Sequence, residues 1–518
     1  MRRTVAVVAC LVAILGLLAP AAFAQAPAPK VTINGLFDQV TSGGKNIYDG
    51  NFSRAGEQEW YARTRFAPQM HFEVGRTKAV LGLEMDLTYG STTGGDGSFG
   101  AGCGKAGSNG CFDINTDIAG IIEIKWMYTE FDLTGKDSLM PFIPVPTRSR
   151  VGAQPFATLA NYKVAYANGD FGGLSAITTW APNLKTNLAY VQIEEEIAGG
   201  HRLARTATNR RGNDFAVIFS PELTPFKGLD IKPLYSYFYA EGGTSGSARR
   251  AVNNQQGAVA PTEENRHTIG VDVRFRSGPF SLDPTVYYQF GDRTQRTGPA
   301  GTIDSKVSAW FVDLIAGWQL GPLLLEARGV WSTGNDSKDD LRQRTRYYEP
   351  LDLDTGYWAG WSNIQALGVD YFNGGGGTLN GMSTNIGYDR YGRRGFALRA
   401  TYSLTPALAF YGIVSPTWTD EKVDTDTTAG AIRGAPASGS SSTCRSNPCN
   451  SGDDRYIGTE VDLGMTWRFA ANTAFDLVGA YLFAGSALDT REAVAPSGFA
   501  TRDAEDGWTI AARMRLSF

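Results

Sequence analysis

Apolar and polar residues alternate one by one along many segments of this chain. Residues 508–518 give the clearest case: one face carries apolar side chains and the other mostly polar or basic ones (Trp508, Ile510, Ala512, Met514, Leu516 and Phe518 against Thr509, Ala511, Arg513, Arg515 and Ser517). Residues 79–89, 396–404 and 460–467 repeat this pattern. A period of two residues is typical of a β-strand between two different environments. Many of these segments run about ten residues or more, enough to cross a bilayer at a tilt, whereas strands of a soluble sandwich usually have about five or six.

The connections between these segments alternate between short and long. Tight turns are predicted near 74–78, 183–185, 277–279, 321–322, 405–407 and 470–472, and long polar connections near 42–56, 90–118, 195–211, 241–264, 292–303, 334–391, 419–454 and 485–505. This asymmetry is typical of an outer-membrane β-barrel with short periplasmic turns and long extracellular loops.

Eighteen strands fit between these connections. Their predicted spans are 31–41, 57–73, 78–89, 120–132, 147–154, 170–180, 185–194, 212–220, 229–240, 265–276, 279–291, 304–320, 322–333, 392–404, 407–418, 455–469, 473–485 and 506–518. Sixteen strands is the alternative, because 147–154 and 170–180 are weakly patterned. The mostly apolar stretch 307–325 is interpreted as two strands around a tight turn, since Asp313 and the Gly321-Pro322 pair interrupt it.

A sheet in lipid has to close on itself, because an open edge leaves backbone N–H and C=O groups without partners. The fold class is therefore all-β, a transmembrane antiparallel barrel. A barrel of about sixteen to eighteen strands is wide enough for a water-filled lumen. The even count places both chain ends on the side of the short turns.

The first 24 residues are predicted to be a secretory signal peptide. Arg2 and Arg3 precede an apolar run at 5–18, and Ala22-Phe23-Ala24 forms a cleavage signal before Gln25. A membrane anchor is the alternative, which the shortness of the run opposes. Cleavage would leave one barrel domain at 25–518 and change the formal net charge from −4 to −6.

Composition agrees with this interpretation. Glycine is about 12 % of the chain, against ~7 % in ordinary proteins, and aromatic residues are 12 %. The mean hydropathy of −0.22 argues against a polytopic helical membrane protein. The acidic balance gives no reason to expect a nucleic-acid partner.

The cysteines left after cleavage form two close pairs, Cys103 with Cys111 and Cys444 with Cys449, both in Gly- and Ser-rich stretches. In an oxidising compartment these pairs predict two disulfides that close local loops. A four-cysteine zinc site is the alternative, but neither pair has C-x-x-C spacing. The three histidines lie near no recognisable nucleophile motif. We therefore expect no enzyme activity, no cofactor and no metal.

The two ends of the chain resemble those of Gram-negative outer-membrane porins. Residues 31–38, Val-Thr-Ile-Asn-Gly-Leu-Phe-Asp, are similar to the first strand of general porins, and the final Phe518 is similar to the aromatic signal of barrel assembly. Residues 148–156 resemble the strand that leads into the porin constriction loop. The resemblance implies a general or substrate-biased porin, a trimer in outer-membrane lipid that admits small hydrophilic solutes or ions by passive diffusion. The alternative is a structural or docking barrel, such as a scaffold or an electron-conduit sheath, without an open channel.

Residues on the polar face of each strand should line the lumen. The basic candidates are Arg63, Arg65, Arg148, Arg150, Arg399, Arg513 and Arg515, and the acidic ones are Glu84, Asp86, Glu123, Glu460 and Asp462. Across all strands the two signs nearly balance, so counting predicts no strong ion selectivity. Barrel closure should bring Arg513 and Arg515 next to Arg63 and Arg65 and create a transverse field. The alternative is that these groups form ordinary cross-strand ion pairs.

Two segments are candidates to narrow the pore. Residues 155–169 occupy the position of the inward-folding porin loop. Residues 334–391 form the longest connection and are rich in aromatic residues, including Tyr347, Tyr348, Trp358 and Trp361. A purely flexible loop of this length is uncommon. This connection is expected to fold into the lumen, cover the mouth or form a subunit contact.

Overall fold

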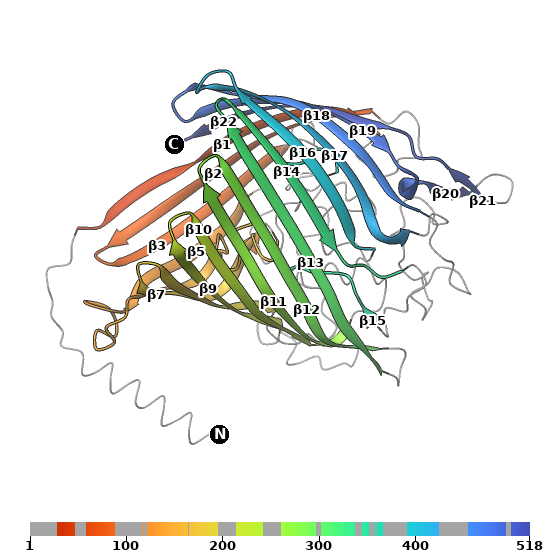
Figure 1. Cartoon of the computed structure of the whole chain (residues 1–518). Coiled ribbons are helices and arrows are strands. Elements are labelled where there is room, and N and C mark those ends of the chain that lie inside the picture. The colour runs from red at the N-terminus through yellow and green to blue at the C-terminus, as the bar shows by residue number, and fades with distance from the viewer. Residues whose placement is uncertain are drawn as a thin grey trace.

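A computed structural model describes residues 28–46, 58–88, 116–117, 122–163, 165–194, 214–241, 261–296, 302–336, 344–351, 358, 360–365, 391–423, 454–493 and 499–518. Eighteen strands of these residues form one antiparallel barrel (Figure 1). They are β1 (Lys30–Lys45), β2 (Gln58–Val74), β3 (Thr77–Thr88), β5 (Ile122–Thr134), β6 (Thr147–Pro155), β7 (Asp170–Ala181), β8 (Leu184–Glu194), β9 (Asp214–Phe226), β10 (Leu229–Glu241), β11 (Pro261–Ser277), β12 (Phe280–Arg296), β13 (Thr302–Leu320), β14 (Leu323–Ser332), β16 (Arg393–Ser403), β17 (Leu408–Val423), β18 (Asp454–Ala470), β19 (Thr473–Ala484) and β22 (Gly507–Ser517).

Each strand pairs with its neighbour in the chain, and β22 pairs with β1 over Leu36–Lys45. The predicted closed barrel is confirmed, and its strand number is eighteen. Strands β6 and β7, whose weak patterns left sixteen as the alternative, pair with each other over nine residue pairs from Thr147↔Thr178 to Pro155↔Asp170.

Several strands extend further than the alternation predicts. Strand β1 continues to Lys45, β11 begins at Pro261, β12 ends at Arg296 and β17 ends at Val423. The connections expected at 42–56, 241–264, 292–303 and 419–454 are therefore partly strand. All four extensions lie at the end opposite the tight turns. Beyond an apolar band both faces of a strand meet polar surroundings, so the alternation is lost while the backbone ladder continues.

Tight turns join strands at one end of the barrel. Several of these turns contain a residue with a left-handed backbone, among them Gly75 (φ 59°) and Asn472 (φ 57°), a conformation that suits two-residue hairpins. Figure 1 shows the C-terminus at this same end, as the even strand number requires.

Smaller elements accompany the barrel. Strand β4 (Thr116–Asp117) pairs with β5, and β15 (Arg344–Thr345) pairs in parallel with β13. A short 3-10 helix (Ser486–Leu488) precedes the hairpin of β20 (Thr490–Ala493) and β21 (Phe499–Arg502). Among the described residues, none forms a helix long and apolar enough to cross a membrane.

The outer wall carries large apolar side chains exposed to the surroundings. Leu463 is 69 % exposed, and Ile33, Trp180 and Ile510 are each 57 % exposed. Aromatic rings contact one another across β8 to β13 on this wall, for example Tyr190 with Phe215 at 5.6 Å and Tyr288 with Trp310 at 4.5 Å between centroids. A continuous apolar outer wall with aromatic clusters is typical of a barrel surrounded by lipid.

The seam between the first and last strands ends in close packing around Gly35. Backbone hydrogen bonds run from Gly35 N to Phe518 O (2.9 Å) and from Phe518 N to Gly35 O (3.1 Å). The Phe518 ring lies 6.0 Å from the Phe37 ring and 6.2 Å from the Phe66 ring. A Cβ atom on Gly35 would lie 2.7 Å from the Ala67 carbonyl oxygen and 2.8 Å from Phe518 Cζ, so glycine is required there.

The variant Gly35→Ala should therefore weaken the seam. We expect a loss of about 1–3 kcal/mol, as for other overpacked sites, because backbone and ring atoms would have to move. The measurement is the temperature at which the folded barrel loses its fast mobility in detergent electrophoresis. The matched control is Gly479→Ala, where a Cβ meets nothing within 4 Å. Equal melting temperatures for the two variants would contradict this account.

Candidate functional site: the inner wall of the barrel

The seam brings predicted lumen residues side by side. Across strands β2, β1 and β22, the register places Arg65, Asp38 and Arg515 in one row. The next row consists of Arg63, Val40 and Arg513. Strand β1 thus separates the two pairs of arginines and places a carboxylate between two of them.

Each described arginine of the seam has a carboxylate partner. Arg513 pairs with Asp38 at 2.5 Å, Arg515 with Asp476 at 2.6 Å and Arg65 with Glu84 at 2.8 Å. Glu84 also binds Lys125 at 3.1 Å and lies opposite Glu123 in the register of β3 and β5. The side chains of Arg63 and Asp86 lie outside the described residues. The geometry here is that of cross-strand ion pairs.

The same pairing continues around the wall. Arg148 lies 3.4 Å from Asp132, and Arg150 lies 2.7 Å from Glu130 and above the Tyr128 ring. Sequence analysis did not name Glu130 and Asp132 as candidates, because strict alternation places them on the opposite face of 122–134 from Glu123 and Lys125. A register shift against β3 at Lys125 brings them to the inner wall.

Arg399 pairs with Glu326 at 2.7 Å and donates a hydrogen bond to the Gly360 carbonyl at 2.8 Å. Its guanidinium also lies above the Trp361 ring at 4.4 Å.

In several of these pairs the cation is more exposed than the anion. The Arg148 side chain is 59 % exposed and that of Asp132 22 %, and for Arg515 and Asp476 the values are 36 % and 11 %. The Arg399 side chain is 27 % exposed and that of Glu326 14 %. Counting charges predicts a near balance, but at these positions the guanidinium groups stand between the carboxylates and the solvent.

Residues 156–163 and 165–169 pack against the inner wall. The carboxylate of Asp272 on β11 accepts hydrogen bonds from the backbone N–H groups of Tyr162 (2.6 Å) and Lys163 (3.1 Å). The ammonium of Lys163 pairs with Asp313 at 2.6 Å, and Asp313 also binds Arg328. Wall carboxylates thus hold this segment by its backbone and by its charge.

The other side of the same segment is apolar. Phe156, Ala160, Ala165, Tyr166 and Ala167 are buried in one cluster with inward residues of β8 to β10, namely Ala189, Val191, Ala216, Ile218, Leu234 and Phe238. The rule that inward residues are polar and line the lumen does not hold on these strands. Their inward side chains form a core under the segment, and the sequence carries no local signal of that cover.

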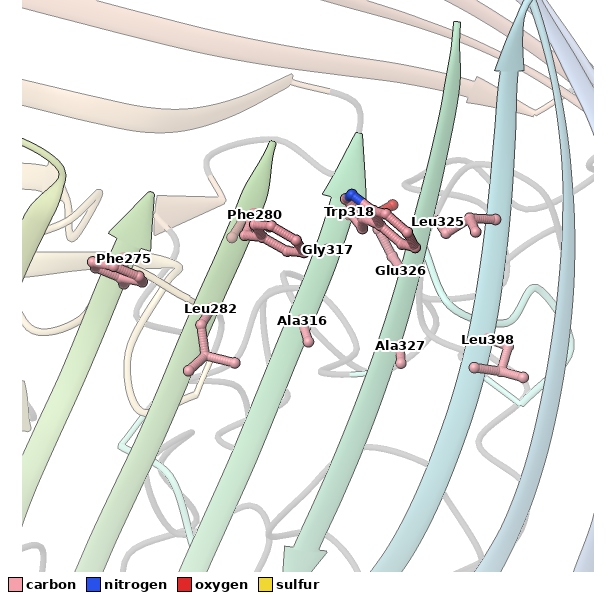
Figure 2. Close-up of a pocket in the computed structure, with 11 residues that line it drawn as sticks. Phe275, Phe280, Leu282, Ala316, Gly317, Trp318, Leu325, Glu326, Ala327 and Leu398 are labelled. Carbon is pink, nitrogen blue, oxygen red and sulfur yellow. The ribbon is translucent and has the colours of Figure 1, made fainter. Parts of the chain in front are cut away.

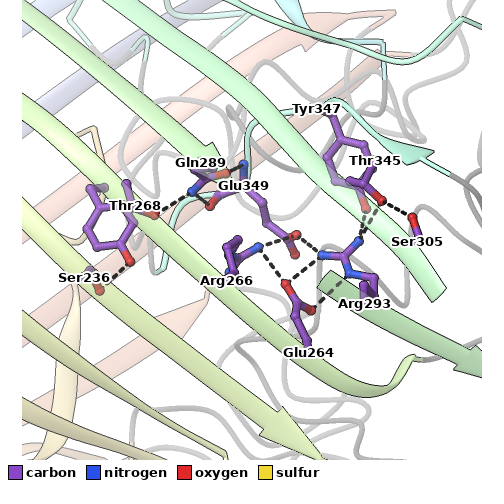
Figure 3. Close-up of polar contacts among 11 residues, drawn as sticks. Ser236, Glu264, Arg266, Thr268, Gln289, Arg293, Ser305, Thr345, Tyr347 and Glu349 are labelled. Carbon is purple, nitrogen blue, oxygen red and sulfur yellow. Dashed lines mark hydrogen bonds and ion pairs between the residues drawn. The ribbon is translucent and has the colours of Figure 1, made fainter. Parts of the chain in front are cut away.

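Residues 344–351 attach to the wall through buried charges. Glu349 pairs with Arg266 at 2.6 Å and with Arg293 at 2.7 Å, and Arg293 pairs with Glu264 at 2.9 Å (Figure 3). All four side chains are at most 2 % exposed, and their formal charges sum to zero. Gln289 binds both the backbone N–H and the carbonyl of Glu349. Such a set is tolerated in a buried site because every charge has an opposite partner.

The two inner segments also contact each other. The Tyr348 hydroxyl donates to the Ala165 carbonyl at 2.8 Å, and the Leu351 N–H donates to the Tyr166 carbonyl at 2.8 Å. Burial raises the pKa of the Tyr348 phenol well above its usual value, so the hydroxyl remains a donor. Residues far apart in the sequence thus form one inner layer.

A third attachment lies on β17 and β18. The Glu460 carboxylate accepts hydrogen bonds from the Ser362 hydroxyl (2.5 Å) and from the backbone N–H groups of Asn363, Ile364 and Gln365 (2.6, 2.8 and 2.9 Å). Asp462 accepts from the Asn363 side chain at 2.7 Å. Both carboxylates lie on the inner wall, where alternation predicts them, but they are buried under residues 362–365.

Other predicted features lie outside the described residues: the signal peptide at 1–24 and the pairs Cys103 with Cys111 and Cys444 with Cys449. Within the described ranges no group of His, Cys, Asp and Glu side chains is arranged to hold a metal ion.

No protein-family model matches the chain, and no curated protein matches it either. Among solved structures, the chain is similar to the outer membrane protein OprD from Pseudomonas aeruginosa, with a TM-score of 0.47, 10 % identity and 94 % of each chain covered. It is also similar to P. aeruginosa OccK8 (OprE), with a TM-score of 0.46, 10 % identity and coverage of 94 % of this chain and 98 % of that one. P. aeruginosa OccK10 (OpdN) gives a TM-score of 0.44 at 11 % identity, with 94 % and 99 % covered.

Replacing Glu460 with alanine should release residues 362–365 from the wall. Each hydrogen bond to a buried carboxylate contributes about 1.5–3 kcal/mol, so exchange protection of these backbone amides should fall by about 100-fold. Hydrogen exchange with mass spectrometry measures this. Glu349→Ala is the matched control, since it should lower the exchange protection of residues 344–351 before that of residues 362–365. Unchanged protection at 363–365 in Glu460→Ala would show that the carboxylate does not hold the segment.

Proposed function

We propose that this chain is an outer-membrane porin, a water-filled channel through which small hydrophilic solutes or ions diffuse passively. The observation that carries the proposal is a closed eighteen-stranded barrel with an apolar outer wall and partly exposed arginines on its inner wall. Exposed guanidinium groups inside a barrel need water around them. A barrel of this strand number has room for that water.

The apolar outer wall and the closed sheet support a location in a bilayer. The signal peptide at 1–24 and the porin-like chain ends point to the outer membrane. Outer-membrane lipid is then the surrounding partner, and the tight turns face the periplasm. Assembly as a homotrimer and the two loop disulfides are part of the same proposal.

Residues 155–169 and 334–391 would act together as the constriction. Their described parts are fixed to the inner wall by Asp272, by the charges around Glu349 and by Glu460. This favours an inward-folded connection at 334–391 over a cover at the mouth or a subunit contact. Solutes would be excluded by size at this layer and oriented by charge beside it, with no bond made or broken.

Single-channel recording in planar bilayers tests the proposal. Purified protein should insert and give discrete, stable conductance steps at a fixed voltage, because the lumen contains water. Blocking by a panel of sugars, amino acids and anions would then identify the solute class. Tight seals with no conductance, despite demonstrated insertion, would instead favour the scaffold or electron-conduit sheath.

The double variant Arg63→Ala with Arg513→Ala should lower the preference for anions. It removes two neighbouring cations and leaves the Asp38 carboxylate without its partner Arg513, so the local potential becomes more negative. Reversal potentials in a salt gradient measure the change. Lys306→Ala is the control, because Lys306 lies on the same outward-facing side of β13 as the exposed Trp310. An unchanged reversal potential in the double variant would overturn the role of this cluster.

A further inference from the structure

The outer wall contains an apolar trough over β12, β13, β14 and β16, near the end with the tight turns (Figure 2). In the register of these strands, Leu282, Ala316, Ala327 and Leu398 lie side by side in one row. One leucine therefore stands on each side of the two alanines. The hollow over the two alanines has a volume of about 470 Å³.

The trough continues along β14. The next outward residue after Ala327 is Gly329, which lies between Leu314 and Phe396 in the register. A Cβ atom at Gly329 would meet nothing within 4 Å, so this position is open as well. Trp318 and Leu325 close the end near the turns, and Trp331 stands at the other end. Figure 2 shows the Phe280 and Trp318 side chains along the closed end.

The dimensions suit one hydrocarbon chain. Trp331 lies six positions after Leu325, which corresponds to about 20 Å along a strand. A strand tilted by about 45° would span about 14 Å of bilayer depth over that length, close to half of the ~30 Å hydrocarbon core.

The residues that line the trough also favour a hydrocarbon chain as its occupant. The trough is lined by Leu, Ala, Gly, Phe and Trp residues together with Ser281 and Glu326, and the Glu326 carboxylate is bound to Arg399 on the inner side of the wall. A polypeptide segment laid there would bury backbone N–H and C=O groups against carbon, at a cost of several kcal/mol each. A stable contact between two copies of the chain needs about 1,200 Å² or more, far beyond one narrow trough.

We propose that this trough holds one acyl chain of a membrane phospholipid as a fixed, non-exchanging part of the outer wall. The proposal rests on the bilayer location proposed above, but not on channel activity. The indole of Trp318, 44 % exposed and stacked on Phe280 at 5.7 Å, would lie at the headgroup end of the chain.

Native mass spectrometry of the protein in detergent, mixed with a defined phosphatidylethanolamine, tests the site. Wild-type protein should retain one phospholipid per chain. The variant Ala316→Leu with Ala327→Leu fills the trough and should lose it. The matched control is Ala512→Leu on β22, an outward position that pairs with the exposed Leu477 on strands away from the trough, which should retain the lipid. Folding of each variant is checked by electrophoretic mobility before and after heating.

A second measurement keeps the proposal testable if the double variant does not fold. With bound phospholipid brominated near the headgroup end of its acyl chain and then diluted into unlabelled lipid, wild-type fluorescence should stay quenched more than that of Trp318→Phe, and the difference belongs to Trp318. Equal lipid retention in all three proteins, or equal quenching in the two, would overturn the proposal. A change of oligomeric state in the filled variant, with lipid retention unchanged, would assign the trough to a second copy instead. Because conductance is not the readout, a failed channel experiment would leave the lipid site standing.

Discussion

Closure of the backbone ladder between the last strand and the first is the constraint on which this structure depends. Strand β22 pairs with β1 from Leu36 to Lys45, and Phe518 completes the seam against Gly35. In hydrocarbon each unpaired backbone group costs several kcal/mol, so no strand edge can remain open. Closure fixes which side chains face inward on every strand. It also brings Arg65, Asp38 and Arg515, from opposite ends of the chain, into one row.

The backbone groups of the inner layer also need hydrogen-bond partners. Residues 156–163, 165–169, 344–351 and 360–365 lie inside a barrel whose wall strands have already paired their own backbone groups with one another. Their N–H groups therefore find side-chain acceptors, Asp272 for one segment and Glu460 for another. Glu349 completes a neutral set with Arg266, Arg293 and Glu264. Polar attachment on one side and an apolar core on the other make this layer a fixed part of the barrel.

Much of the wall could be predicted from the sequence, because alternation and turn residues are local signals. At the tight-turn end the predicted spans agree with seventeen of the eighteen strands to within two residues, and β9 is the exception, since it runs to Phe226 rather than 220. The other disagreements lie at the opposite end, where strands such as β11 and β17 continue past the apolar band. The inward positions of Arg148, Arg399, Glu460 and Asp462 follow from alternation as well. The environments of these residues do not follow from alternation, since Glu460 and Asp462 are buried while the Arg148 side chain is largely exposed.

A closed all-β barrel, its strand order and the face of most charged strand residues could thus be predicted from the sequence alone. This is so because a period of two and a short turn depend only on neighbouring residues. The three-dimensional arrangement was needed to show which inward residues meet water, which form a core under a connection and which carboxylate pairs with which arginine. Those outcomes depend on contacts between segments as distant as Ala165 and Tyr348, and no local pattern encodes them. Likewise, no local sequence pattern marks the small residues at 316, 327 and 329, and the register of the strands is what places them in one trough.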